Sequence, residues 1–169
     1  MTINALFAAD QFGGMGLNGS LPWPHNSSDL KQFKRLTDGQ VVVMGRRSWD
    51  DPKLPKPLAG RTVYVATTRP VQHATPIAGD IRTAVQAVQA QHPNKTIWVV
   101  GGPEILEQCQ DLYDRIYLTH IKGVYKIDTK INLKSMLSGY RMVSASAAPS
   151  DNCTFTVYES IFKRTTTGS

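Results

Sequence analysis

The sequence contains little cysteine and no pattern that would use it. Cys109 and Cys153 are the two cysteines among 169 residues, and neither belongs to a CxxC or Cys/His pattern with metal-ligand spacing. This argues against a disulfide framework and against a zinc site. Two free thiols in the core of a cytoplasmic protein are the better interpretation, and we expect no bound metal.

Long apolar runs and a basic leader are also lacking. No apolar stretch approaches the roughly 20 residues that cross a bilayer. The N-terminal segment MTINALFAADQ has neither a basic start nor a small-residue cleavage site, so it is predicted to be a buried strand and not a signal peptide. We therefore expect a soluble, cytoplasmic protein with no membrane partner.

Acidic residues are outnumbered, with 13 Asp and Glu against 19 Lys and Arg and a formal charge of +6. Such a charge attracts an anionic partner, which can be nucleic acid, a membrane surface or a polyanionic small molecule. The basic residues are scattered, without the stripe or the aromatic-rich basic motif of a nucleic-acid reader. We expect no nucleic-acid partner.

The apolar pattern predicts an α/β domain. With 41% hydrophobic residues, the chain has a globular composition and a length typical of one domain. We assign residues 1–164 to this domain and expect residues 165–169 to be a disordered tail. Because segments of helical period lie between several strands, the sheet should be largely parallel. Short apolar runs rich in β-branched residues predict strands at 3–9, 41–44, 62–66, 96–100, 116–121 and 155–162.

The helices are predicted from their caps and their apolar spacing. They are expected at 27–37 behind a capping Asn26 or Ser27, after Gly45, at 81–91 behind Asp80, and from Pro103 onward. No helix separates the last two strands, near 141–147 and 154–162, which should form an antiparallel hairpin at the end of the sheet.

The segment GMGLNGSLPWPHNSSDLKQFKRL joins a glycine-rich loop, a Leu-Pro-Trp turn and a helix that opens with an acid. Asp29 lies in the first helical turn, one turn before Phe33, so its carboxylate can share a face with an aromatic ring. Position alone favours the alternative, a solvated acid that stabilises the helix dipole.

Two strand ends carry groups that suit a phosphate. In VVVMGRRSW, a buried strand leads into Gly45 and a helix start with Arg46, Arg47 and Ser48, where backbone N–H and guanidinium groups can bind an anion. The structural alternative is a basic first turn that opposes the helix dipole. In TVYVATTRP, another strand ends in two hydroxyls and an arginine, a pattern that is also typical of an ordinary turn.

The segments IWVVGGPEILEQ and RIYLTHIKGVYKIDT are less specific. Gly101 and Gly102 lack the GxGxxG pattern of a Rossmann site, and they fit either a close backbone approach to a ligand or a tight strand-to-helix turn. Thr119 and His120 stand at the centre of a strand. We give His120 no catalytic role, because a lone strand histidine is more often packed or facing solvent.

In their order along nearly the whole chain, these segments resemble the dihydrofolate reductase family. The resemblance rests on the set LPW, DLKQFK, MGRRSW, PLAGR, VVGGPEI and YLTHI. It implies an α/β fold with an eight-stranded, mostly parallel sheet, an antiparallel C-terminal strand and about four flanking helices. It also implies NADPH-dependent reduction of 7,8-dihydrofolate to 5,6,7,8-tetrahydrofolate, binding of antifolate inhibitors, and a monomer.

The resemblance implies a role for each matching position. Asp29 matches the acid that hydrogen-bonds N3 and the 2-amino group of the pterin, and Thr119 matches the residue that supports this contact. Trp23 matches the tryptophan that helps to hold an ordered water, and Leu21 lies in the mobile loop that closes over the nicotinamide. Arg61 matches the arginine that pairs with the carboxylate of the glutamate tail, a contact for which lysine is a poor substitute.

The remaining matches belong to the walls of two pockets. Around folate, the apolar positions are Ala5, Leu6, Leu30, Phe33, Leu58 and Val100. Around the cofactor, the positions are Met15, Gly45, Arg46, Arg47, Ser48, Thr67, Thr68, Gly101, Gly102, Glu104, Ile105 and Thr129. The arginines, Ser48, Thr67 and Thr68 surround the phosphates, including the 2′-phosphate, which implies NADPH in preference to NADH. Gly101 and Gly102 match a pair joined by a cis peptide.

The implied chemistry follows the cofactor, whose nicotinamide supplies hydride to C6 of dihydrofolate while N5 gains a proton. Asp29 holds the opposite edge of the ring and cannot reach N5 directly. It is expected to orient the pterin and favour its protonated form, while the water near Trp23 and Leu21 delivers the proton. Desolvation in an apolar pocket should raise the pKa of Asp29.

The sequence departs from the family's pattern at Asn4, Leu106 and Glu104, and it is longer before Asp29 and before Leu58. From Asn4 and Leu106 we expect pterin-mimicking antifolates to bind less well than they do to common bacterial enzymes.

Two other functions compete with this interpretation. One is a reductase of the riboflavin pathway, which shares the fold and the cofactor, and the other is a noncatalytic module that kept the pocket. The acid that follows LPW argues against the first, because it suits the aminopterin edge. The set of Asp29, Arg61 and Thr119 argues against the second.

Overall fold

The protein is described by a computed structural model that covers residues 2–162, so the tail expected to be disordered lies outside the described residues. Its strands are β1 (Thr2–Asp10), β2 (Gly14–Gly16), β3 (Val41–Gly45), β4 (Thr62–Ala66), β5 (Thr75–Ile77), β6 (Thr96–Gly101), β7 (Arg115–Ile121), β8 (Thr129–Lys130), β9 (Tyr140–Ala148) and β10 (Cys153–Ser160). Its helices are α1 (Ser27–Thr37), α2 (Arg46–Trp49), α3 (Ile81–Gln91), α4 (Pro103–Gln108) and α5 (Leu133–Met136), with 3-10 turns η1 (Gln110–Leu112) and η2 (Pro149–Asp151).

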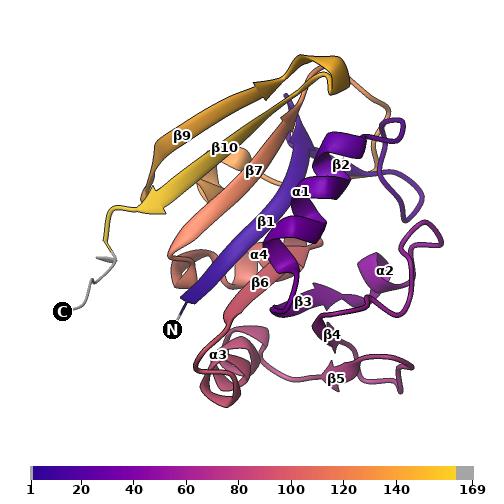
Figure 1. Ribbon diagram of the computed structural model, residues 1–169, viewed down its shortest axis with the longest axis vertical. Coiled ribbons are helices and arrows are strands. Elements are labelled where there is room, and N and C mark those ends of the chain that lie inside the picture. Colours follow the sequence, from indigo (N-terminus) through magenta and orange to yellow (C-terminus); the bar gives the residue numbers. More distant parts are fainter. Residues whose placement is uncertain (1, 163–169) are drawn as a thin grey trace.

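Eight strands form one sheet in the order β5-β4-β3-β6-β1-β7-β10-β9 (Figure 1). The pairings from β5 across to β7 are all parallel. Strand β10 runs antiparallel to both of its neighbours, β7 and β9. The predicted mostly parallel sheet with an antiparallel C-terminal strand is therefore confirmed.

The differences from prediction concern short elements. Strands β2, β5 and β8 and helix α5 are two to four residues long, too short for a hydrophobic period to be seen. The residues described contain five α-helices, in agreement with the expectation of about four. Strand β10 ends at Ser160, and the next residues, Ile161 and Phe162, are 56% and 81% exposed. The apolar pattern had extended this strand too far.

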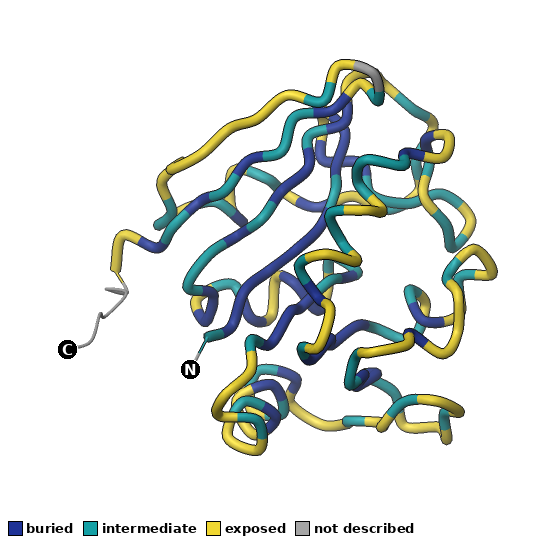
Figure 2. The backbone as a smooth tube through the Cα atoms, viewed as in Figure 1, coloured by how far each residue is buried: buried dark blue, intermediate teal, exposed yellow. Residues whose placement is uncertain are grey.

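Alternate residues of each central strand face two different cores. On β1, Ile3 and Phe7 belong to a cluster that includes residues of α3, α4 and α5. On β3, Val42 and Met44 face the other side, where they pack with Trp49 of α2. Buried residues consequently follow the inner strands, while β9 at the sheet edge is exposed along most of its length (Figure 2).

Several local predictions hold at the residue level. Helix α3 spans the predicted residues, and the Asp80 side chain caps it by accepting a hydrogen bond from the Thr83 N–H. Pro103 stands at the start of α4, as predicted from its missing N–H. Cys109 and Cys153 are both buried and free.

Two features are absent from residues 2–162. No helix in this range is long and apolar enough to cross a membrane. No group of three or more His, Cys, Asp or Glu side chains in the same range is arranged to hold a metal ion.

Candidate active site

The side chain of Asp29 meets strand β7 from the first turn of α1. Asn26 caps the helix, because its Oδ1 accepts a hydrogen bond from the Asp29 N–H at 3.0 Å. Thr119, which is fully buried on β7, donates a hydrogen bond from its hydroxyl to Asp29 Oδ1 at 2.7 Å. Two residues that are 90 positions apart in the sequence are thus joined at one carboxylate.

Burial raises the pKa of Asp29 above its usual range, and the hydrogen bond from Thr119 opposes this by lowering it. Burial is the larger cause, because removal from water disfavours the charged carboxylate. A perturbed acid that is also held by a specific partner is a candidate for a functional group. The solvated helix-cap acid that position alone favoured is not what the fold forms.

Trp23 lies in a small buried cluster near Asp29's helix. Its ring packs with Ile121 and Cys153 and makes an edge contact with Tyr125, with ring centroids 6.1 Å apart. Within residues 2–162, its buried indole N–H has no protein acceptor. A buried donor of this kind requires a partner, and a water molecule is the simplest one available.

The loop that carries Leu21 makes two hydrogen bonds to carboxylates just before that residue. The Asn18 N–H donates to Asp128 Oδ2 at 2.9 Å, and the Ser20 hydroxyl donates to Asp51 Oδ2 at 3.2 Å. Leu21 follows directly and is 41% exposed. The loop therefore presents an apolar side chain to its surroundings, while one backbone N–H and one side-chain hydroxyl are held by two carboxylates.

Three of the predicted folate-pocket residues form one apolar cluster. Phe33 and Val100 pack against the group that contains the buried Leu58. The guanidinium carbon of Arg61 lies 5.7 Å from the centre of the Phe33 ring, and its Nη1 donates to the Thr37 hydroxyl at 3.3 Å. A cation is thus fixed at the edge of an apolar surface.

The other three predicted folate-pocket residues differ in their exposure. Leu6 is buried at 4%, while Leu30 on α1 is 45% exposed, so its side chain is accessible to an apolar ligand. Ala5 is fully buried in the core that faces α3 and α4, beside Ile3 and Phe7. Because strand neighbours alternate, the Ala5 side chain points away from the face that carries α1.

The glycines predicted to bind the cofactor gather where β3 and β6 end. A Cβ placed on Gly45 would lie 3.3 Å from Cγ1 of Ile105 and 3.5 Å from the carbonyl oxygen of Gly101. A Cβ placed on Gly101 would lie 3.7 Å from Ser48 Oγ and 4.0 Å from Met15 Cε. Gly101 and Gly102 are joined by a cis peptide bond, as the resemblance implied. Predicted residues from three separate segments therefore meet here.

Arg46 lies across the ends of β3 and β4. Its Nε contacts both oxygens of Asp50, at 3.1 and 3.0 Å, and its Nη1 donates to the Thr67 hydroxyl at 3.5 Å and to the Pro70 carbonyl at 3.3 Å. The exposed predicted cofactor residues are Arg47, Thr68 and Glu104. Thr129 is half-buried on β8, beside Gly16.

A family model described as "Dihydrofolate reductase" matches residues 2–165 of this sequence. The chain belongs to the dihydrofolate reductase family. A type 8 dihydrofolate reductase of Escherichia coli is 32% identical over 145 residues, covering 82% of this chain and 85% of that protein. A type 9 dihydrofolate reductase of E. coli is 30% identical over 166 residues, covering 94% and 91%. The expected family is therefore confirmed.

A solved structure supports the fold. Dihydrofolate reductase from Enterococcus faecalis, complexed with NADP(H) and RAB-propyl, superimposes with a TM-score of 0.78 at 24% identity, covering 95% of this chain and 96% of that one. The activity of the dihydrofolate reductase family is NADPH-dependent reduction of dihydrofolate to tetrahydrofolate, and membership makes this chain an oxidoreductase of that kind.

Sequence reasoning missed three carboxylates that hold the loop and the helix of the candidate site. Asp51 and Asp128 hold the loop around Leu21, and Asp151 contacts the first turn of α1. The partners of Asp128 and Asp151 lie 110 and more positions away, and no local pattern marks such pairs. Asn26 was predicted only as one of two possible caps.

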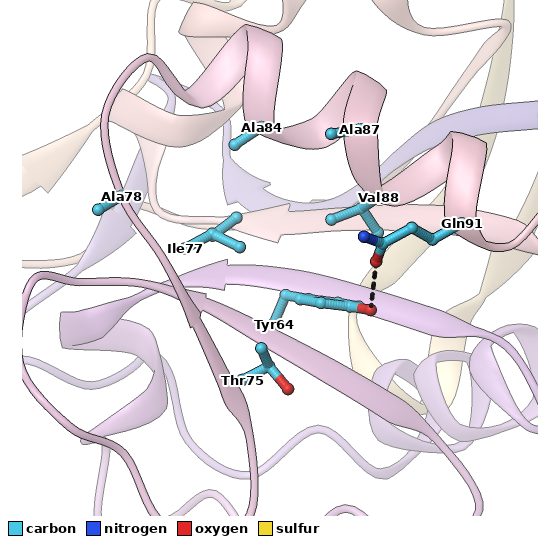
Figure 3. Close-up of a pocket in the computed structure, with 8 residues that line it drawn as sticks. All are labelled: Tyr64, Thr75, Ile77, Ala78, Ala84, Ala87, Val88 and Gln91. Carbon is cyan, nitrogen blue, oxygen red and sulfur yellow. Dashed lines mark hydrogen bonds between the residues drawn. The ribbon is translucent and has the colours of Figure 1, made fainter.

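A separate pocket lies between α3 and the strands β4 and β5 (Figure 3). It is lined by Tyr64, Thr75, Ile77, Ala78, Ala84, Ala87, Val88 and Gln91. None of the predicted site residues of this dihydrofolate reductase belongs to it. The predicted site residues lie elsewhere, around Asp29 and Gly45.

Proposed function

We propose that this chain reduces 7,8-dihydrofolate at the site built around Asp29, with the carboxylate binding N3 and the 2-amino group of the pterin. The observation that carries the proposal is the 2.7 Å hydrogen bond from Thr119 to Asp29 Oδ1. This contact fixes one oxygen while the carboxylate keeps further lone pairs for the two adjacent N–H donors of the ring. The charge stabilises the protonated pterin.

The proton for N5 of the pterin would come from groups other than Asp29. The buried indole N–H of Trp23 would hold a water that transfers its proton to N5, and Leu21 would cover that water from the loop. The protein would then contribute to catalysis by orientation and electrostatics. Asp29 fixes the pterin ring, and the apolar surroundings strengthen the electrostatic effect of its charge.

The aromatic ring and the glutamate tail of the substrate would lie along the apolar cluster, beyond the pterin. Phe33, Leu58, Leu30 and Val100 would contact the aromatic ring between pterin and tail, and Leu6 would form the buried wall. Arg61, already fixed by Thr37 and Phe33, would pair with the tail carboxylate. For Ala5 only a backbone contact fits, since its side chain lies in the opposite core. The same surfaces suit an antifolate inhibitor.

The cofactor NADPH fits the glycine-lined end of β3 and β6. A Cβ on Gly45 would crowd the Ile105 side chain at 3.3 Å, and Gly101 has a φ of +133°, which side chains rarely allow. Glycine therefore suits both positions and leaves that surface free for a ligand. Met15, Ser48 and Gly102 would line the nicotinamide half. When bound, NADPH supplies the hydride that C6 accepts. The structural relative from E. faecalis carries NADP(H), which supports this placement.

Arg46, Arg47, Thr67 and Thr68 would bind the phosphates, so Arg46→Ala should weaken selection of NADPH. We expect KM for NADPH to rise about tenfold, with little change for NADH, because a charge-assisted contact to the 2′-phosphate is lost. Steady-state kinetics with both cofactors checks this. Arg82→Ala is the matched control, since Arg82 is also paired with an aspartate, Asp111, and should alter neither KM. An equal loss for NADPH and NADH would contradict the role.

The raised pKa of Asp29 sets an expected pH dependence. A carboxyl whose burial disfavours ionisation keeps its proton to higher pH. Asp29 and the bound pterin should therefore lose their shared proton in one coupled titration as pH rises, which leaves the pterin unprotonated. Hydride transfer should then slow by about tenfold per pH unit. Single-turnover rates measured from acid to alkaline pH test this.

The variant Thr119→Val tests whether Asp29 governs this pH dependence. Since the Thr119 hydrogen bond lowers the pKa of Asp29, its removal should move the decline in rate to higher pH. An unmoved profile, or a rate that increases with pH, would show that Asp29 does not govern the titration.

The proposal as a whole is tested by mixing the protein with dihydrofolate and NADPH and following the absorbance of reduced nicotinamide. Rapid, dihydrofolate-dependent oxidation is expected, whereas tight NADPH binding without turnover would indicate a noncatalytic module. We also propose that residues 1–164 act as one domain, as a monomer in the cytoplasm.

A further inference from the structure

The turn between β9 and β10 contacts the first turn of α1. The Asp151 carboxylate accepts hydrogen bonds from the Ser28 N–H at 3.0 Å, from the Ser28 hydroxyl and from the Ser27 hydroxyl at 3.4 Å. The first N–H groups of a helix have no partner within the helix. Here one of them is satisfied by a residue 123 positions away in the sequence.

Asn26 extends this contact to Asp29. Its Nδ2 donates to the Asp151 carbonyl oxygen at 2.8 Å, while its Oδ1 accepts from the Asp29 N–H at 3.0 Å. Asn26 is buried, and the thiol of Cys153 lies 3.9 Å from the same Oδ1. The backbone of the pterin-binding acid is therefore attached to the β9–β10 turn through one buried amide.

The same hairpin also holds the partner of Asp29. Strand β10 pairs with β7 so that Phe155 lies opposite Thr119 and Cys153 opposite Ile121. Helix α1 and the Thr119 hydroxyl are consequently both anchored to one hairpin. A shift of the β9–β10 turn would change the distance between Asp29 and Thr119, which is where the substrate ring must be held.

We propose that Asp151 is a positioning residue for dihydrofolate reduction, which acts by fixing the first turn of α1 and so the carboxylate of Asp29 against Thr119. The inference rests on the proposed function of Asp29. Within residues 2–162, Asp151 hydrogen-bonds Ser27, Ser28 and Asn26, and the charge of Lys31 also acts on it, but it makes no hydrogen bond to Asp29. Its effect must therefore pass through the helix backbone.

The test separates dihydrofolate from NADPH. Asp151→Ala should lower kcat/KM for dihydrofolate about tenfold, because a small displacement of a group that orients the substrate is costly, while the Kd for NADPH stays unchanged. Asp151→Asn keeps an oxygen that can accept from the Ser28 N–H, so it should recover most of the loss. This conservative variant also covers the case in which the alanine variant fails to fold.

Asp80→Ala is the matched control, since Asp80 caps α3 in the same way, accepting from the Thr83 N–H at 3.0 Å. Both alanine variants should lose thermal stability, but only Asp151→Ala should lose kcat/KM at saturating NADPH. Equal stability losses with unchanged kinetics in both would overturn the inference and leave Asp151 as a helix cap.

A double-mutant comparison decides whether Asp151 works through Asp29. In an Asp29→Asn background, Asp151→Ala should have no further effect on kcat/KM, because residues of one unit are not additive. A further tenfold loss there would contradict the route through Asp29. Normal turnover in Asp29→Asn would contradict the proposed function itself. Normal kinetics in Asp151→Ala alone would contradict only the positioning role of Asp151, so the two failures can be told apart.

Discussion

Asp29→Asn is expected to lower kcat at neutral pH by about 10²-fold or more, the size of a general-acid or electrostatic contribution, while NADPH still binds with its normal affinity. The amide keeps the size of the carboxyl and a contact with Thr119. It lacks the negative charge that stabilises the protonated pterin. Steady-state oxidation of NADPH gives kcat, and quenching of protein fluorescence gives the Kd for the cofactor.

Asp38→Asn is the control for this substitution, because Asp38 is an exposed acid at the opposite end of the same helix. It should leave kcat unchanged. Near-normal turnover in Asp29→Asn, or an equal loss in Asp38→Asn, would remove Asp29 from its proposed role.

The same substitution has an expected effect on stability. A carboxyl whose pKa is raised in the folded protein favours the fold at low pH, and this contribution is lost as pH rises through the raised value. Asp29→Asn removes the cost of keeping a partly buried charge, so its Tm should exceed that of the natural protein at neutral pH but not in acid. Thermal unfolding at both pH values checks the sign. Loss of stability at neutral pH would contradict it.

Arg61→Ala is expected to raise KM for dihydrofolate by about 10²-fold with little change in kcat. A fork-to-fork contact between guanidinium and carboxylate is strong, and it is made equally in the ground state and the transition state, so its loss appears as KM. Arg61→Lys should recover little of this, since an ammonium cannot form two parallel hydrogen bonds.

A substrate without the glutamate tail provides the chemical control for Arg61. A simple dihydropterin should be reduced equally well by the natural protein and by Arg61→Ala. Arg35→Ala, at an exposed arginine of α1 that contacts Gln32, is the matched protein control and should leave KM unchanged. A similar loss with the tail-less pterin would mean that Arg61 acts on the structure and not on the tail.

The long elements and most of their bounds follow from local sequence. The run at 62–66 and the helix at 81–91 agree with β4 and α3 residue by residue, because their period and their caps are local features. Strands β2, β5 and β8 have no such signal, since each is too short for alternation and is formed by its pairing partner.

Side-chain direction was less predictable than position. The resemblance placed Ala5 among the folate contacts, but the alternation of β1 sends its side chain into the core with α3 and α4. Asn4, whose polarity led us to expect weaker antifolate binding, uses its Oδ1 to accept from the Arg115 N–H at 3.1 Å. Its polarity thus serves the junction of β1 and β7, and the expectation about antifolates stays a prediction that inhibition constants can test.

The site itself required long-range contacts that no local pattern contains. In isolation, Asp29 is an acid in a first helical turn, whereas in the fold its carboxylate is partly buried and accepts a hydrogen bond from Thr119 on β7. The same holds for Asp128 and Asp151, whose roles depend on loops brought together by the sheet. The family resemblance predicted Asp29 and Thr119, whereas the contacts of Asp128 and Asp151 were found only in the fold.

The most direct test of the role of Asp29 is a structure of the protein with folate and NADP⁺ bound. The carboxylate of Asp29 is predicted to lie within hydrogen-bond distance of both N3 and the 2-amino group of the pterin while keeping its contact with Thr119. The nicotinamide should lie against Gly101 and Gly102. A pterin bound with its amino edge away from Asp29 would contradict the account.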